Sequence, residues 1–167
     1  MEHDYLTDGF WAASAKEELS NPGLSVTILK YMEDVTDKVL KGVTDDMDRE
    51  KREAVINANI TAINAEAVKG THYLSAVRPF FLGNQYFLLV NEVFRDVRLV
   101  GAPPSAIGKF GGDTDNWVWP RHTGDFSLFR VYASKENKPA AYSADNVPYR
   151  PAYHFPVSLA GVSEGDF

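Results

Sequence analysis

Residues 109–133 decide the fold of this chain and read KFGGDTDNWVWPRHTGDFSLFRVYA. The first part, up to Gly124, mixes glycines, acids, two tryptophans, an arginine and a histidine without a regular period, which is typical of a loop. The second part, from Asp125 to Ala133, changes abruptly to the composition and alternation of a strand. The stretch therefore predicts a loop that holds a site against a β-sheet.

Asp125 opens this predicted strand. Both faces of the strand are largely apolar, as in a barrel strand with little exposure, with Phe126, Leu128 and Arg130 on one face and Ser127, Phe129 and Val131 on the other. A carboxylate in such a place needs a partner, because an uncompensated buried charge is costly. A neutral imidazole is one natural partner and would make Asp125 the orienting acid of a serine-peptidase triad. A turn cap, or an ion pair with Arg121 or Arg130, would also satisfy it.

Histidine spacing gives little support for a metal. His122 lies three residues before Asp125, but a tight loop need not turn the two side chains toward each other. The other histidines, His3, His72 and His154, show no ligand spacing, and the absence of cysteine excludes thiolate zinc sites and disulfides. We expect no metal and no cofactor; a metal hydrolase using His122 and Asp125 is the alternative to be tested.

Asn116, Trp117 and Trp119 could wall a pocket, because indole rings offer apolar surface and an asparagine offers both a donor and an acceptor. The two rings could equally plug the end of a barrel, and a non-enzymatic β-domain that binds a ligand through Trp117 and Trp119 is a second alternative. A nucleophile is missing from the chain, since no serine lies in a Gly-x-Ser-x-Gly or Gly-Asp-Ser-Gly context.

Composition excludes several classes of partner. The formal net charge is −6 and the 17 basic residues are scattered, so neither nucleic acid nor an anionic membrane surface is expected to bind. No apolar run approaches the ~20 residues that span a bilayer. The polar run after Met1 and the apolar Phe167 after a turn suggest a piece of a larger protein.

Periodicity outlines the order of elements. After an irregular start, a strand is expected over 24–31 and two helices within about 32–69. The second helix should begin at Thr44 or Asp45, end near Lys69, and carry one apolar stripe, made of Ile56, Ile60, Ile63 and Ala67.

Past Gly70 the period drops to two. Strands are expected over 71–82 and 85–93, around a two-residue Gly83-Asn84 hairpin turn, and over 96–100, 125–133 and 154–159, with a polar loop at 134–150. The predicted fold class is mainly antiparallel β with a helical excursion at about 32–69, in one unit spanning residues 1–167.

Several segments of the sequence are distinctive when taken together. The longest are Phe110–Trp117 and Trp119–Ser127; shorter ones are Glu2–Leu6, Asn21–Leu24, Asp96–Pro104 and Glu164–Phe167. Together these segments resemble the bacterial dipeptidyl-peptidase 7 and 11 family of serine exopeptidases. The likeness covers essentially the whole chain, and the central motif is long enough to be specific.

The resemblance implies a fold and a set of site residues. The catalytic unit would be a chymotrypsin-like double β-barrel, with this chain forming part of the first barrel. Asp125 would be the triad aspartate, and Asn116 and Trp117 would bind the free α-amino group and first residue of a peptide substrate. The triad histidine and serine would both lie outside residues 1–167, so the chain alone is expected to be inactive. A periplasmic or cell-surface location and a homodimeric parent enzyme are further expectations from the family.

Overall fold

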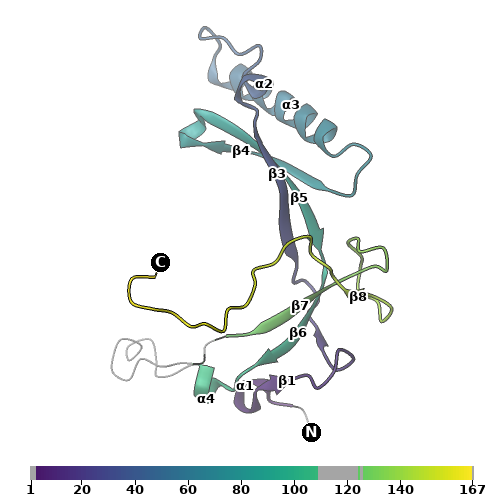
Figure 1. Cartoon of the computed structure of the whole chain (residues 1–167). Coiled ribbons are helices and arrows are strands. Elements are labelled where there is room, and N and C mark those ends of the chain that lie inside the picture. The colour runs from purple at the N-terminus through teal and green to yellow at the C-terminus, as the bar shows by residue number, and fades with distance from the viewer. Residues whose placement is uncertain (1–2, 109–123, 125, 167) are drawn as a thin grey trace.

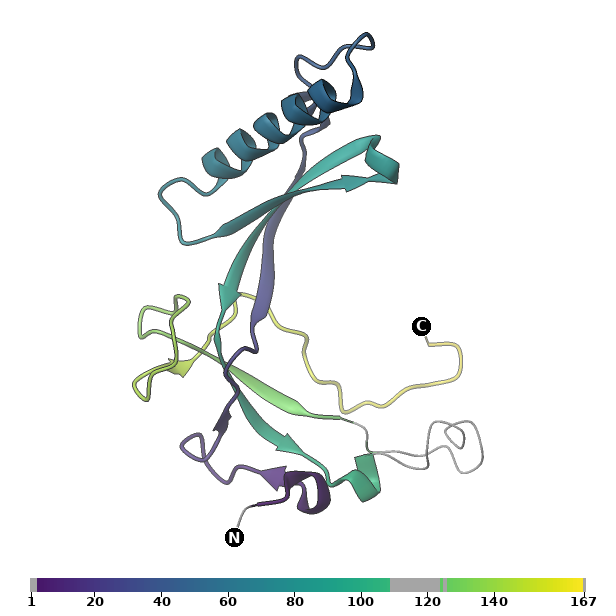
Figure 2. The ribbon, with the colours of Figure 1, turned by 180° about the vertical axis from the view of Figure 1, so that it is seen from behind.

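The computed structural model describes residues 3–108, 124 and 126–166. Its helices are α1 (Tyr5–Asp8), α2 (Thr36–Val39), α3 (Arg49–Ala67) and α4 (Ser105–Gly108), with a 3₁₀ turn, η1, at Phe81–Gly83. Its strands are β1 (Phe10–Trp11), β2 (Leu19–Ser20), β3 (Val26–Asp34), β4 (Leu74–Phe80), β5 (Gln85–Phe94), β6 (Asp96–Ala102), β7 (Leu128–Ala133) and β8 (Val147–Pro148). Figures 1 and 2 show an elongated, bowed molecule with α3 at one end and β1 and α4 at the other.

A three-stranded antiparallel sheet and α3 form the first half of the molecule. The strand order is β3-β5-β4, and the predicted helical stripe packs on the sheet. The buried core consists of Val35, Val39, Val77, Tyr86, Leu88 and Val90, and the partly buried residues against it include Ile56, Ile60, Ile63 and Ala67. The stripe was therefore predicted correctly, because residues spaced by three and four positions share one face of a helix.

β5 joins the two halves. Its burial alternates strictly from Gln85 to Phe94, so every second side chain faces the core. The chain then passes Arg95 and continues as β6, the strand that β1, β2 and β7 all pair with in the second, five-stranded sheet. Every strand pair among the described residues of the two sheets is antiparallel. The predicted fold class, mainly antiparallel β with a helical excursion, is confirmed, and the sheet curls as one half of a barrel does (Figure 1).

Several element boundaries differ from the prediction. The long helix starts at Arg49, capped by the side chain of Asp48, and the predicted caps at Thr44 and Asp45 were wrong. The connection between β4 and β5 is not a two-residue turn: it spans residues 81–84, with Phe81 at φ 49° and Leu82 at φ 60°. These bulky residues adopt a left-handed conformation that local propensity disfavours, which is why the sequence pattern missed it.

Two predictions about strands near the C-terminal part were also wrong. β7 begins at Leu128, and its first residues are not shielded: Leu128 is 48% and Phe129 46% exposed. Residues 154–159 form neither helix nor strand and pair with no described strand. Conversely, the segment expected to be irregular, 1–23, contains α1, β1 and β2. Short strands of two residues carry too little pattern to be recognised without their partner.

Candidate functional site

The predicted site residues Asn116, Trp117 and Asp125 lie outside the described residues, as do Trp119 and His122. The structure does describe the residues that flank 109–123, namely α4 with Gly108 on one side and Gly124 on the other. We call these flanking residues the frame. The flanking glycines, Gly108 and Gly124, are held close together, because the Gly124 N–H donates to the Ile107 carbonyl over 2.9 Å. The frame therefore brings the end of α4 next to the residue that precedes Asp125.

Two glycines near the frame leave no room for a side chain, because neighbouring side chains approach their Cα atoms closely. A Cβ on Gly124 would lie 2.9 Å from Ile107 Cγ2, and one on Gly101 would lie 2.3 Å from Cε3 of the Trp11 ring. The Trp11 indole thus lies directly against Gly101 of β6, and its ring centre is 6.0 Å from that of Phe126. Phe126 N in turn donates to the Gly124 carbonyl over 3.0 Å. Both chain neighbours of Asp125 are therefore anchored to β1, β6 and α4.

The strand that follows Asp125 is tied down by a buried carboxylate. Glu18 accepts hydrogen bonds from Arg130 Nε and the Tyr132 hydroxyl, each over 2.8 Å, although it is 112 and 114 residues away in sequence. Burial, then the hydrogen bond to Glu18 and its charge, raise the pKa of Tyr132. Arg130, one of the ion-pair partners considered for Asp125, is thus engaged by Glu18.

A second ion pair, with both side chains buried, lies on β6. Arg98 donates from Nε and Nη2 to the two oxygens of Asp96, over 2.9 and 2.7 Å, and its guanidinium stacks 3.7 Å from the Tyr132 ring centre. Asn146 also donates to Asp96 over 2.8 Å. Burial would raise the pKa of Asp96, but the hydrogen bonds from Arg98 and Asn146 and the charge of Arg98 outweigh it, so the pKa is lowered. Through Ser143 and Asn146, the pair fastens the segment between β7 and β8 to the sheet. The stretch 134–150 was predicted to be a loop throughout, but it contains the short strand β8.

A third cluster lies on the other sheet. Glu92 Oε1 is 2.6 Å from His72 Nε2, and Glu92 Oε2 is 3.3 Å from Lys30 Nζ. Burial would raise the pKa of Glu92, but hydrogen bonds from His72 and Lys30 outweigh it and lower the pKa. One carboxylate does not make a metal site, and the described residues contain no group of three or more His, Cys, Asp or Glu that could hold a metal ion.

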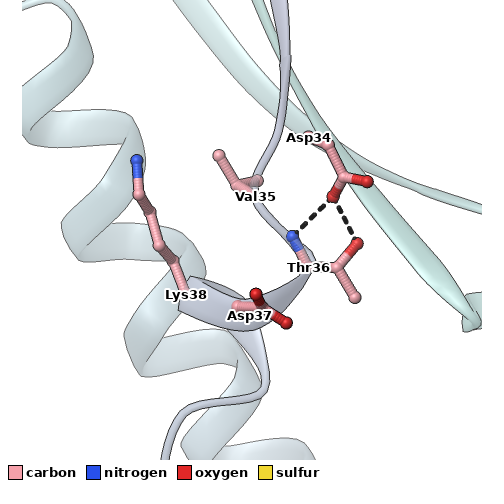
Figure 3. A pocket seen from close by; sticks show the side chains of 5 residues that line it. All are labelled: Asp34, Val35, Thr36, Asp37 and Lys38. Atoms are coloured by element: carbon pink, nitrogen blue, oxygen red, sulfur yellow. Dashed lines mark hydrogen bonds between the residues drawn. The ribbon is translucent and has the colours of Figure 1, made fainter.

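A surface hollow of about 350 Å³ is lined by residues 34–38, which include α2. Figure 3 shows the side chains that line it. Asp34 Oδ1 accepts hydrogen bonds from the backbone N–H of Thr36, over 2.9 Å, and from its hydroxyl, over 2.6 Å. Both hydrogen bonds lower the pKa of Asp34, and the bond from the Thr36 hydroxyl contributes more than the bond from the Thr36 backbone N–H. Since Asp34 is already satisfied by the turn it closes, we assign this hollow a structural role in starting the one-turn helix α2.

Sequence reasoning missed Glu18, Asp96 and Arg98. Asp96 and Arg98 had a readable signal, since opposite charges two residues apart in a strand share one face. Glu18 had none, because its two partners lie on a strand more than a hundred residues away.

In the described part of the chain, no helix is long and apolar enough to cross a membrane.

The fold defines a class: a curved antiparallel β domain in which α4 and Gly124 flank a tryptophan-containing stretch of sequence, residues 109–123. Comparison with known families narrows it. The model of the Peptidase S46 family matches residues 1–167, and the chain belongs to this family. The resemblance to dipeptidyl-peptidases 7 and 11 is confirmed.

Individual relatives agree with this placement. The chain is 57% identical to an Asp/Glu-specific dipeptidyl-peptidase of Capnocytophaga gingivalis, over 100% of this chain and 24% of the relative. It is 53% identical to dipeptidyl-peptidase 7 of Porphyromonas gingivalis, again over 100% of this chain and 24% of the relative. It superimposes on the crystal structure of Porphyromonas endodontalis DPP11 in complex with the dipeptide Arg-Asp with a TM-score of 0.84 and 48% identity, covering 99% of this chain and 25% of that one. The chain thus spans about a quarter of the length of the relatives it matches.

Proposed function

We propose that this chain belongs to an enzyme that releases dipeptides from the free N-terminus of peptides. The observation that carries the proposal is the family match along the whole chain, with relatives named dipeptidyl-peptidases at 57% and 53% identity. Support for a peptide substrate comes from the similar DPP11 structure, which holds a dipeptide. The chain is similar to relatives of both names, so identity over these residues does not choose between an acidic and another side-chain preference.

The proposed chemistry is acyl transfer through a Ser-His-Asp triad. The serine hydroxyl attacks the second peptide bond, the histidine takes the hydroxyl proton and later gives it to the leaving amine, and water hydrolyses the acyl-enzyme. Asp125 holds the histidine in the correct tautomer and stabilises the imidazolium. By the family resemblance, the serine and histidine lie outside residues 1–167, so a polypeptide of these residues alone has no dipeptidyl-peptidase activity.

Asn116 and Trp117 are proposed to bind the N-terminal end of the substrate and so to fix the length of the released product at two residues. Release of dipeptides requires a stop that recognises the α-ammonium group two residues from the cleaved bond. An asparagine carbonyl can accept hydrogen bonds from that ammonium, and an indole face can attract its charge. No cofactor is needed for this chemistry. From the family resemblance we also propose a periplasmic or cell-surface location and a homodimeric enzyme.

The role of Asp125 is tested by Asp125→Ala in the full-length enzyme. We expect kcat to fall by roughly 10⁴-fold with the fold unchanged, because loss of an orienting acid leaves the histidine in the wrong tautomer. Steady-state kinetics on a fluorogenic dipeptide substrate measures the loss, and circular dichroism checks the fold. Asp145→Ala, which removes an exposed acid from the 134–150 loop, is the matched control. Near-normal turnover of Asp125→Ala would refute the assignment of Asp125 to the triad.

The role of Asn116 is tested by Asn116→Ala with paired substrates. We expect kcat/KM to fall by about 10-fold or more on a dipeptide substrate with a free amine, the cost of one charge-assisted hydrogen bond of roughly 1.5–3 kcal/mol. The same substrate with an acetylated amine is the comparison, because it carries no ammonium for Asn116 to bind. Equal losses on both substrates would count against recognition of the amine.

A further inference from the structure

The Glu18 side chain connects three strands of the second sheet. Glu18 directly precedes β2, which pairs with one side of β6, whereas its two hydrogen-bond donors, Arg130 and Tyr132, belong to β7 on the other side of β6. Because β2 and β7 do not pair with each other, the Glu18 side chain reaches across β6 to join them. This side chain is only 2% exposed, and its burial arises from contacts within the described residues.

The charge of Glu18 also offsets repulsion between two arginines. Arg98 of β6 and Arg130 of β7 are partners in the strand register, and like charges directly opposite each other on one face of a sheet are destabilising. Asp96 balances the charge of Arg98, and Glu18 balances that of Arg130. Loss of Glu18 would therefore remove an anchor of β7 and leave the Arg130 charge opposite that of Arg98.

The hydrogen-bond ladder between β6 and β7 is irregular where β7 begins. The register shifts between residues 99 and 101 of β6, opposite the first two residues of β7. The carbonyl of the residue between them, Val100, accepts a hydrogen bond from Ala12 N over 2.9 Å, on the β1 side. A shift of this kind interrupts the ladder and changes the local twist of the strands. The backbone ladder alone therefore fixes the start of β7 poorly, and the Glu18 contacts to Arg130 and Tyr132 lie directly beyond the shift.

The placement of β7 matters for the proposed reaction. Catalytic groups must be held within about 0.5 Å of their productive geometry by supporting contacts, and a misplacement of about 1 Å can cost about 100-fold in rate. We propose that Glu18 is a positioning residue of the enzyme, which fixes β7 through Arg130 and Tyr132 and thereby the placement of Asp125, five residues before Arg130. The inference rests on the proposed function, because it takes Asp125 as the triad acid.

The direct test is Glu18→Ala in the full-length enzyme, with Glu92→Ala as the matched control. Glu92 is also a buried carboxylate with two side-chain partners, but it lies on the other sheet. Where circular dichroism shows both variants folded, we expect kcat of Glu18→Ala to fall about 10- to 100-fold, with KM changed less than about threefold. The kcat of Glu92→Ala should stay within about twofold of the native value. Equal losses of kcat in the two variants, or a loss for Glu18→Ala that appears only in KM, would overturn the proposal.

A double-mutant cycle with Asp125→Ala separates positioning from a general structural effect. If Glu18 acts through Asp125, Glu18→Ala should lower kcat by less than about twofold when residue 125 is already alanine. A further loss as large as in the native background would overturn the positioning role and leave the triad assignment standing. Near-normal turnover of the single variant Asp125→Ala would instead refute the triad role of Asp125 and the positioning role with it, so the two failures are distinguishable.

Tyr132→Phe provides a milder variant in case Glu18→Ala does not fold. It removes one of the two donors to Glu18 and keeps the aromatic ring that lies against the Arg98 guanidinium. We expect kcat to fall by about threefold or more, as for the loss of one hydrogen bond, and the loss to disappear in the Asp125→Ala background. An unchanged kcat for Tyr132→Phe would overturn the proposal.

Discussion

At the scale of single residues, the most constrained group is the Arg98 guanidinium. It donates to both carboxylate oxygens of Asp96 and to the Ser143 carbonyl, and it lies over the rings of Tyr132 and Tyr142 at 3.7 and 4.9 Å. The side chain of Asp96 is fully buried. A buried ion pair contributes little net stability as a pair, but removing one partner leaves an uncompensated charge.

Asp96→Ala is therefore expected to cost about 3–5 kcal/mol of local stability around β6, because it leaves the buried Arg98 charge without a partner. Hydrogen exchange of β6 and β7 peptides in the full-length protein measures this locally, which suits a protein of several parts. Glu53→Ala is the matched control, since it breaks an ion pair with Arg49 whose side chains are 58% and 90% exposed, and no measurable change is expected. Equal effects of the two variants would show that the Asp96 pair is not buried in the native protein.

At the scale of elements, a local capping residue determines where α3 begins, and tertiary contacts determine where it packs. Asp48 accepts a hydrogen bond from Lys51 N over 2.8 Å and starts the helix, and the isoleucine stripe packs it on the sheet. The position of α2 against α3 depends on Asn59, whose side-chain amide donates to the carbonyls of Val39 and Lys41, each over 2.9 Å.

Asn59→Ala is expected to destabilise the α2–α3 unit by roughly 1–3 kcal/mol, because the carbonyl of the fully buried Val39 loses its partner. Asn57→Ala on the exposed face of the same helix is the control and should be neutral or slightly stabilising, since alanine has the higher helix propensity. Exchange of α2 and α3 amides gives both values. A loss for Asn57→Ala as large as for Asn59→Ala would refute the role assigned to the two carbonyl contacts.

At the scale of the whole molecule, two buried carboxylates lie on the continuous run from β5 to β6, Glu92 in one sheet and Asp96 in the other. In both, burial alone would raise the pKa, and hydrogen bonds from cationic and amide partners lower it on balance. A folded-state pKa below the unfolded value contributes stability that is fully present above the unfolded values, near 3.9 for Asp and 4.3 for Glu, and is lost as pH falls through the folded pKa.

We therefore expect both sheets to lose stability together below about pH 4, with little dependence on these two groups between about pH 5 and 7. Exchange-derived stability of β5 and β6, measured as a function of pH, should show this acid limb. The combined variant Glu92→Gln and Asp96→Asn should flatten it, whereas Asp145→Asn, which alters an exposed acid, is the comparison. An acid limb that is as steep in the double variant as in the native protein would contradict the assignment.

The sequence by itself determined the fold class, the apolar stripe by which α3 packs on the sheet, and the family. These follow from local periodicity and from contiguous motifs, which depend on residues close together in the chain. Only the tertiary structure decided the pairing of Glu18 with Arg130 and Tyr132 and the four-residue connection at 81–84. It also showed that residues 154–159 pair with no described strand. The physical reason is that a strand or a buried charge is completed by a partner distant in sequence, and no local pattern specifies which partner that is.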